Sequence, residues 1–138
     1  MIVSTKARYG VRAMYVLAEN VAVGKPISIK YIAGVQKISE QYLEQIFSKL
    51  KKAQLVRSIR GQKGGYVLNK RPDEISIGQV IRSLEGPLAP VNCVHDESCC
   101  DKIDSCCANA MWTSIYNDVN KVVDSYFISD MLKENNDD

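Results

Sequence analysis

The segment SEQYLEQIFSKLKK, residues 39–52, has the pattern of an amphipathic helix. Its apolar residues recur at intervals of three and four, which places them on one helical face. They are Leu43, Ile46, Phe47 and Leu50. Ser39 precedes the run, where its side-chain oxygen can accept hydrogen bonds from the first free backbone amides. The sequence therefore predicts a helix with one face in a core and the other face free for recognition.

The outer face of this helix begins with amides and a carboxylate and ends with cations. The polar residues are Gln41, Glu44, Gln45 and Ser48, followed by Lys49, Lys51 and Lys52. Amides and carboxylates can pair with adenine and cytosine edges in a major groove, whereas lysines suit phosphates. An ordinary solvated helix would carry similar residues, so this segment alone leaves both interpretations open.

Two helices are predicted before this segment. The first runs from Ser4 or Thr5 to about Asn20, and Gly10 inside it hints at close helix packing because glycine is unfavourable there. The second follows Ser28 and spans residues 29–36, with a short link to the segment above. Two short helices, the second with a polar outer face, predict a helix-turn-helix.

Residues 55–68 predict a β-hairpin with a basic tip. LVRSI (55–59) and YVL (66–68) are typical of strands, and the glycine-rich RGQKGG (60–65) supplies the permissive backbone of a turn. Arg60 and Lys63 at the tip would meet a phosphate or a minor groove. A phosphate-cradling glycine loop is the alternative, but the spacing fits no such signature. The hairpin is therefore interpreted as the wing of a winged helix.

A capped helix is predicted over residues 77–84, and a longer one from about 108 to 126. A long apolar stripe after a complete small domain has few partners in its own chain, so we expect it to pair with a second copy in a two-fold homodimer. Folding back onto its own head is the alternative. A short helix over 128–132 and a frayed polar tail would end the chain.

The fold class is thus mainly α with a small β-hairpin, a winged helix-turn-helix with a long C-terminal dimerisation helix. The predicted division is a DNA-binding unit over residues 1–86, a cysteine-rich segment over 87–107 and a dimerisation unit over 108–138.

Charge is divided unevenly along the chain. Residues 1–72 hold 14 Lys and Arg against 3 Asp and Glu, whereas residues 73–138 hold 4 against 13. A basic half joined to an acidic half is typical of a nucleic-acid-binding head with a separate body. No apolar run approaches the roughly 20 residues of a membrane span, and the N-terminus lacks a signal-peptide core, so we expect a cytoplasmic protein without a membrane partner.

All five cysteines lie between residues 93 and 107. An odd number of cysteines in so short a segment does not look like a disulfide scaffold, and it favours metal or redox chemistry. Soft thiolates favour iron–sulfur clusters, zinc or copper(I), but structural zinc usually uses CxxC pairs, which the segment lacks. Cluster-free sensing by thiol oxidation is the main alternative.

Four stretches carry a family resemblance: STKARYGVRAM (4–14), ISEQYLEQIFSKLKKAQLVRSIRGQKGGYVL (38–68), SIGQVIRSLEGPLAPV (76–91) and the cysteine segment leading into Met111 and Trp112. They resemble the Rrf-two (Rrf2) family of winged-helix transcriptional regulators over about residues 1–132. LEGPLAPV is most similar to cysteine-metabolism repressors of this family, whereas the cysteine segment is more similar to its iron–sulfur regulators.

The resemblance implies a homodimer that binds double-stranded palindromic promoter DNA, with the 39–52 helix in the major groove and the wing in the minor groove. Gln41, Glu44, Gln45 and Arg60 match base-reading positions of the family. The full predicted contact set is Ser39, Gln41, Tyr42, Glu44, Gln45, Ser48, Lys49, Arg57, Arg60, Lys63 and Tyr66.

The resemblance also implies a 2Fe–2S cluster held by Cys93, Cys100 and Cys106. Asn109 stands where the iron–sulfur relatives carry a histidine ligand, and asparagine is a poor iron ligand. The candidates for the fourth ligand are Cys107, Cys99 and His95.

Two other functions remain as alternatives to a cluster-sensing regulator. A cluster-free regulator of cysteine metabolism could bind a partner such as cysteine synthase, as the resemblance to cysteine-metabolism repressors implies. A thiol redox enzyme is disfavoured, because the chain has a single histidine to partner its thiols. We therefore expect a regulator and not an enzyme.

Overall fold

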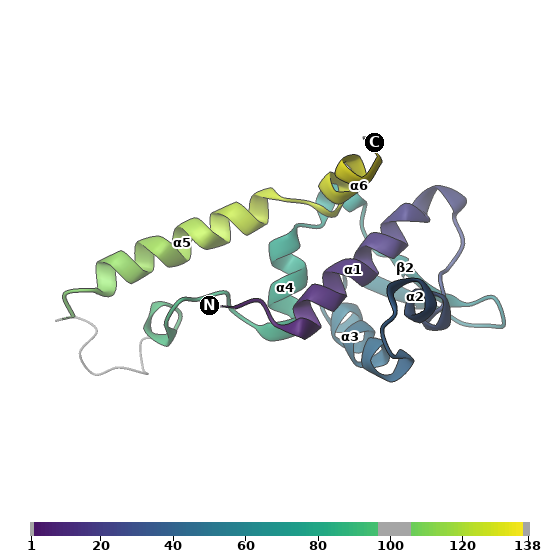
Figure 1. The fold of residues 1–138 in the computed structure, drawn as a ribbon, viewed down its shortest axis with the longest axis horizontal. Coiled ribbons are helices and arrows are strands. Elements are labelled where there is room, and N and C mark those ends of the chain that lie inside the picture. Colours follow the sequence, from purple (N-terminus) through teal and green to yellow (C-terminus); the bar gives the residue numbers. More distant parts are fainter. Residues whose placement is uncertain (1, 97–105, 137–138) are drawn as a thin grey trace.

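The computed structural model describes residues 2–96 and 106–136. Within these ranges the α-helices are α1 (Thr5–Glu19), α2 (Ile29–Gln36), α3 (Glu40–Lys52), α4 (Ile77–Glu85), α5 (Asn109–Ser125) and α6 (Ile128–Asn136). The strands β1 (Val56–Ile59) and β2 (Gly65–Leu68) form one antiparallel hairpin. Short 3-10 turns are η1 (Val21–Val23), η2 (Pro72–Glu74) and η3 (Asn92–Val94). The predicted winged helix-turn-helix and the longer helix after it are confirmed (Figure 1).

A serine begins each of the helices α1 to α4. The side-chain oxygens of Ser4, Ser28, Ser39 and Ser76 each accept a hydrogen bond from the backbone amide three residues later. At Ser76 the side chain of Gln79 also returns to the serine amide, which completes a capping box. Each cap contributes about 1 kcal/mol, so the helix starts are fixed locally by the sequence.

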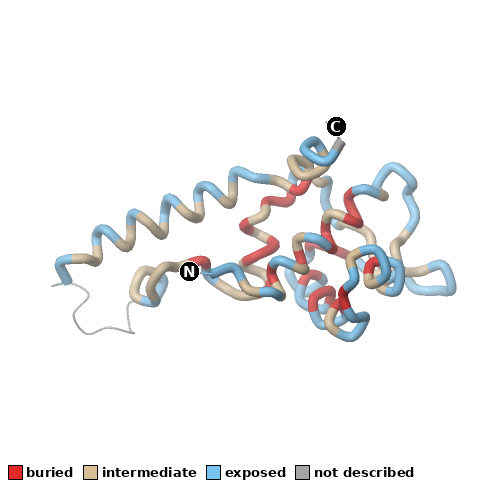
Figure 2. The backbone as a smooth tube through the Cα atoms, in the orientation of Figure 1, coloured by how far each residue is buried: buried red, intermediate tan, exposed pale blue. Residues whose placement is uncertain are grey.

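The core lies where α3 meets α1, α4 and the hairpin. All four apolar residues predicted for the inner face of α3 are fully buried: Leu43, Ile46, Phe47 and Leu50. The Phe47 ring packs on Tyr66 of β2, with ring centroids 4.6 Å apart. Figure 2 shows the buried residues gathered in this head, whereas α5 is exposed or half-buried.

The hairpin is attached to the rest of the head through the first residues of β2, Gly65 and Tyr66. Backbone hydrogen bonds of 2.9 and 3.0 Å join Tyr66 to Ile27, which precedes α2. Gly65 has a φ of 154°, and a Cβ there would collide with the Ile27 backbone, so this close approach requires glycine. The wing is therefore held against the helix-turn-helix by main-chain contacts.

The C-terminal helix returns to the head after α5. Ile128 is fully buried, and Met131 and Leu132 pack against the same core as α3. The prediction of a short helix that ends at Leu132 and a frayed tail from Lys133 was wrong, because α6 continues to Asn136. The longer helix is stabilised near its end by Asn135, whose side chain donates to the Met131 carbonyl at 2.8 Å.

Gly10 marks a close crossing of α1 and α4, as its place in the helix hinted. An added Cβ would meet the Leu84 side chain, while Gly34 in α2 faces open space. Overpacking a core typically costs about 1–3 kcal/mol, whereas Gly→Ala in an exposed helix gains about 0.5–1 kcal/mol.

We therefore expect Gly10→Ala to lower the free energy of unfolding by about 1 kcal/mol and Gly34→Ala to raise it by a similar amount. Urea denaturation at one fixed protein concentration measures both. Equal stabilisation by the two substitutions would show that the α1–α4 crossing relaxes around a methyl group.

Candidate nucleic-acid interface and sulfur segment

The outer face of α3 forms one shallow surface with the start of α1. Its lining residues are Lys6, Gln41, Glu44, Gln45, Ser48, Lys49 and Lys52. Five of these were predicted from the sequence as contacts, and all five are exposed. Lys6 was missed as a contact, because the face of α1 that lies beside α3 depends on tertiary packing.

This surface combines hydrogen-bonding groups with positive charge. Glu44 is its only carboxylate, and no ion pair of the described residues involves it or the three lysines. Lys49 makes one long hydrogen bond, 3.4 Å from its Nζ to the Leu84 carbonyl oxygen. The lysines are therefore available to phosphates, while the exposed Glu44 carboxylate disfavours phosphate and suits a base donor.

The tip of the hairpin carries exposed cations. Arg60 and Lys63 lie between the strands, and both are exposed. Gly61 has a φ of 118°, and its carbonyl accepts a 3.0 Å hydrogen bond from the Gly64 amide. A narrow turn with two exposed cations has the shape and charge to meet a phosphate or a minor groove.

Four other predicted contacts occupy different surroundings. The ring of Tyr42 meets Tyr9 edge-on at 5.7 Å, and Tyr66 packs on Phe47, so both tyrosines have a packing role. Arg57 is exposed on β1 and lines a separate groove beside the hairpin. Ser39 is the N-cap of α3 and holds the Tyr42 amide at 3.1 Å.

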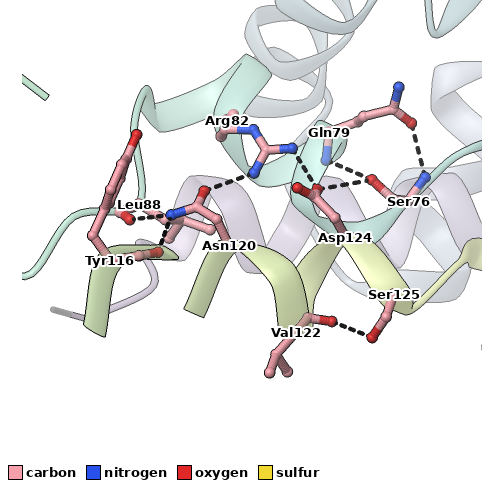
Figure 3. A network of polar contacts seen from close by, with 9 residues as sticks. All are labelled: Ser76, Gln79, Arg82, Leu88, Tyr116, Asn120, Val122, Asp124 and Ser125. Carbon is pink, nitrogen blue, oxygen red and sulfur yellow. Dashed lines mark hydrogen bonds and ion pairs between the residues drawn. The ribbon is translucent and has the colours of Figure 1, made fainter. Parts of the chain in front are cut away.

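A polar network joins α4 to α5 (Figure 3). The guanidinium of Arg82 donates to Asn120 at 2.9 Å and pairs with Asp124. The hydroxyl of the α4 cap, Ser76, also donates to Asp124, at 3.3 Å. Because the side chains of Arg82 and Asp124 are both partly exposed, this ion pair contributes little to the free energy of unfolding. Its main effect is to orient α5 relative to α4. The network fixes the angle at which α5 leaves the head.

The same network reaches the connector that leads to the cysteines. The carboxamide of Asn120 donates to the Leu88 carbonyl at 3.0 Å and to the Tyr116 carbonyl at 2.8 Å. Leu88 is itself buried against Ala7 and Ile81. The position of α5 is thus linked to the chain just before Cys93.

Asn109 contacts both described parts of the cysteine-rich segment, residues 87–107, which is also called the sulfur segment below. The side-chain nitrogen of Asn109 lies 4.0 Å from Cys93 Sγ, and its backbone amide donates to the Cys106 carbonyl at 3.3 Å. Asn109 begins α5, and η3, which contains Cys93, packs against that helix. The two ends of the cysteine segment therefore converge at the start of α5.

The predicted ligands are only partly described. Cys93 is half-buried, Cys106 and Cys107 are exposed, and His95 is exposed. Cys99 and Cys100 lie outside the described residues. The described ranges contain no group of three or more His, Cys, Asp or Glu placed to hold a metal. The donor chemistry of the segment suits an iron–sulfur cluster, but the described geometry alone does not assemble its ligands.

Large apolar side chains remain exposed on α5 and at its C-cap, Tyr126. Met111, Val122 and Tyr126 remain 52%, 55% and 54% exposed, and α5 contains no buried residue. The helix extends away from the head (Figure 1). No helix in the described ranges is long and apolar enough to span a bilayer.

Comparison with known proteins gives a consistent match over the whole chain. The profile of the Rrf2 family, described as "Iron-dependent Transcriptional regulator", matches residues 3–134. The HTH-type transcriptional regulator CymR of Bacillus subtilis is 44% identical over 131 residues, covering 95% of this chain and 89% of CymR.

Two solved structures have the same fold. The structure of CymR, named the global cysteine regulator of B. subtilis, aligns with a TM-score of 0.79 at 40% identity, covering 97% of this chain and 98% of that one. The structure of T. potens IscR aligns with a TM-score of 0.78 at 38% identity, covering 99% of this chain and 90% of that one.

Proposed function

Because the chain belongs to the Rrf2 family of transcriptional regulators, we propose that it acts as a cytoplasmic homodimer that binds palindromic promoter DNA. The observation that carries this proposal is the α3 surface, where exposed amides and a carboxylate lie beside unpaired lysines. The basic first half of the chain, residues 1–72, supplies the matching long-range attraction to DNA.

The residues have distinct roles in this proposal. Gln41, Glu44 and Gln45 read base edges from the major groove, and Arg60 with Lys63 enters the adjacent minor groove. Ser39, Tyr42, Ser48, Lys49, Arg57 and Tyr66 support or contact the DNA backbone, as does Lys52, whose charge already suited phosphates in the sequence. Lys6 is added because it lines the same surface. Phosphate contacts set affinity and register, while the amides set sequence preference.

The second copy is proposed to cover the exposed side of α5. Met111 and Val122 on α5 and Tyr126 at its C-cap are large apolar side chains left half exposed, and such side chains suit pairing with a second copy in a two-fold dimer. Since α4 holds α5 through Arg82, the dimer would set the distance between the two α3 helices.

The sulfur segment is proposed as the sensor of iron–sulfur, redox or cysteine status. If a 2Fe–2S cluster is resident, Cys93, Cys100 and Cys106 would hold it with Cys107, Cys99 or His95. Such a cluster supplies a redox-sensitive and labile link across the segment. A change at Cys93 or Cys106 reaches α5 through Asn109, which contacts both.

A cluster-free regulator is the second candidate, and two observations favour it. Asn109, at the position where iron–sulfur relatives carry histidine, offers no soft ligand, and the chain is 44% identical to CymR, whose structure is named as a cysteine regulator. In that case the thiols respond by oxidation, or the protein binds a partner such as cysteine synthase. The relatives are regulators, so a thiol enzyme is not proposed.

The first prediction separates base reading from phosphate binding. Gln45→Ala should weaken operator binding by about 1–3 kcal/mol without changing the salt slope, because it removes only a base contact. Lys52→Ala should weaken binding to all duplexes and reduce the slope by about 1. Fluorescence anisotropy on operator and scrambled duplexes over a salt series measures both quantities. Affinities that are independent of salt would contradict phosphate-dominated binding.

The second prediction concerns the dimer. Val122→Lys should produce a 15.4 kDa monomer in light scattering, because it buries an unpaired charge in the proposed interface. Asn117→Lys is the matched control, since it adds the same charge at an exposed polar position elsewhere on α5. A dimer that survives Val122→Lys with unchanged affinity would remove this face of α5 from the interface.

The third prediction concerns the cofactor. Anaerobically purified protein should show visible absorption with about two iron and two sulfide per chain, and Cys106→Ala should lose both. Gel-shift titration of the loaded and apo forms then tests whether the segment controls DNA affinity. A colourless, iron-free protein that captures cysteine synthase would instead support the cluster-free candidate.

A further inference from the structure

A groove of about 520 Å³ lies beside the hairpin, apart from the α3 surface. It is formed by the end of α1, the connection from α1 to α2, both strands and the segment before η2. Figure 1 places the hairpin and this connection at the end of the molecule away from α5. The groove and the α3 surface share no lining residue, although Arg57 and Tyr66 of the groove also belong to the predicted DNA-contact set.

Apolar side chains form much of the groove. Leu17 is buried, and Ile27, Val67, Leu68 and Pro72 are half-buried along its wall. Pockets that bind small molecules are mostly apolar, fall between about 300 and 1,000 Å³ and contain a few polar groups that orient the ligand. The size and lining of this groove meet that description.

The charged groups around the groove are unbalanced. Lys25, Arg57 and Lys70 line it, and the side chain of none of the three makes an ion pair or a hydrogen bond to another described residue. The lining carboxylate, Glu74, is already paired with Arg71 at 2.9 Å. Three cations therefore line the groove beside apolar side chains, and none is paired with an anion of the described residues.

We propose that this groove binds a small organic anion, a carboxylate with a compact apolar body. The carboxylate would meet Arg57, whose planar fork suits bidentate pairing, with Lys25 and Lys70 beside it. The apolar body would lie against Leu17, Ile27 and Val67. The Asn69 carboxamide already donates to the Gln54 carbonyl at 2.9 Å, so the cations carry the polar recognition.

An occupant of this groove would contact both strands of the wing. Arg57 lies on β1, and its cross-strand partner Val67 lies on β2. The binding itself requires neither DNA nor the cysteine segment, so it can be tested separately from the proposed regulatory function.

The experiment is a titration of the full-length 15N-labelled protein with 2-naphthoate, followed by amide chemical shifts. We expect saturable shifts at Gly24, Val67 and Lys70, with no change at Gln45 and Ser48 on α3. The uncharged analogue 2-naphthol should bind at least about tenfold more weakly, because it lacks the carboxylate.

Matched variants locate the charge. Arg57→Gln and Lys70→Gln should each raise the Kd for 2-naphthoate about fivefold or more, while Lys30→Gln, an exposed cation on α2 outside the groove, should leave it unchanged. Absence of saturable shifts in the groove, or equal affinity of wild type, Arg57→Gln and Lys70→Gln, would overturn the proposal.

A duplex phosphate is the competing anion, and the same variants distinguish it. If 2-naphthoate leaves the groove amides unmoved while Lys70→Gln weakens DNA binding and reduces the salt slope by about 1, the cations serve the DNA backbone and the ligand site is refuted. If DNA binding fails in wild type but the 2-naphthoate shifts persist, the ligand site stands without the proposed function.

Discussion

The burial of one face of α3 is the constraint on which the rest of the head depends. Leu43, Ile46, Phe47 and Leu50 are fully buried, and each such side chain contributes about 1.5–3 kcal/mol relative to exposure. Because the four lie on one face, their burial fixes the rotation of α3 about its own axis. That rotation presents Gln41 and its neighbours to solvent. The same helical periodicity therefore sets the burial of α3 and the orientation of the residues that we propose to read DNA.

The wing and the C-terminal helix both depend on the same core. The ring of Tyr66 rests on Phe47, and its backbone is bonded to Ile27, so the hairpin cannot move freely relative to α3. Ile128 of α6 is fully buried in this core as well. Consequently the C-terminal half of α5 is tied to the head by α6 and, through Asn120 and Asp124, by the network around Arg82.

The sequence predicted most of the local structure of the head because its signals are local. Serine caps, the α3 apolar periodicity and the glycines of the turn each act within a few residues, and all lie where they were expected. The extension of α6 beyond Leu132 was missed, because its composition is polar and the helix is anchored by the packing of Ile128, Met131 and Leu132 against a distant core.

The surface was less predictable than the fold. Lys6 joins the α3 surface only because of how α1 crosses α3, and Arg57 lines a groove with Lys25, which lies in another part of the sequence. Neither association has a spacing signal, since tertiary packing creates both. The cysteines are a third case. Their thiols predict a sensor, but a cluster also needs a suitable ligand at each position, and Asn109 is a poor iron ligand at the position where the resemblance implies a histidine.

The position of Asn109 suggests how a local change in sulfur chemistry can have a distant effect. It begins α5, contacts the residues at both ends of the cysteine segment and lies on the same helix as Asn120 and Asp124. Since α6 and Arg82 restrain the other end of α5, a shift at Asn109 cannot simply translate the helix. We expect such a shift to tilt α5 against α4 or to stretch the Asn120–Leu88 hydrogen bond. In a dimer paired through α5, such a tilt would change the separation of the two α3 helices. Binding to a palindromic site requires that separation to match the spacing of the two half-sites.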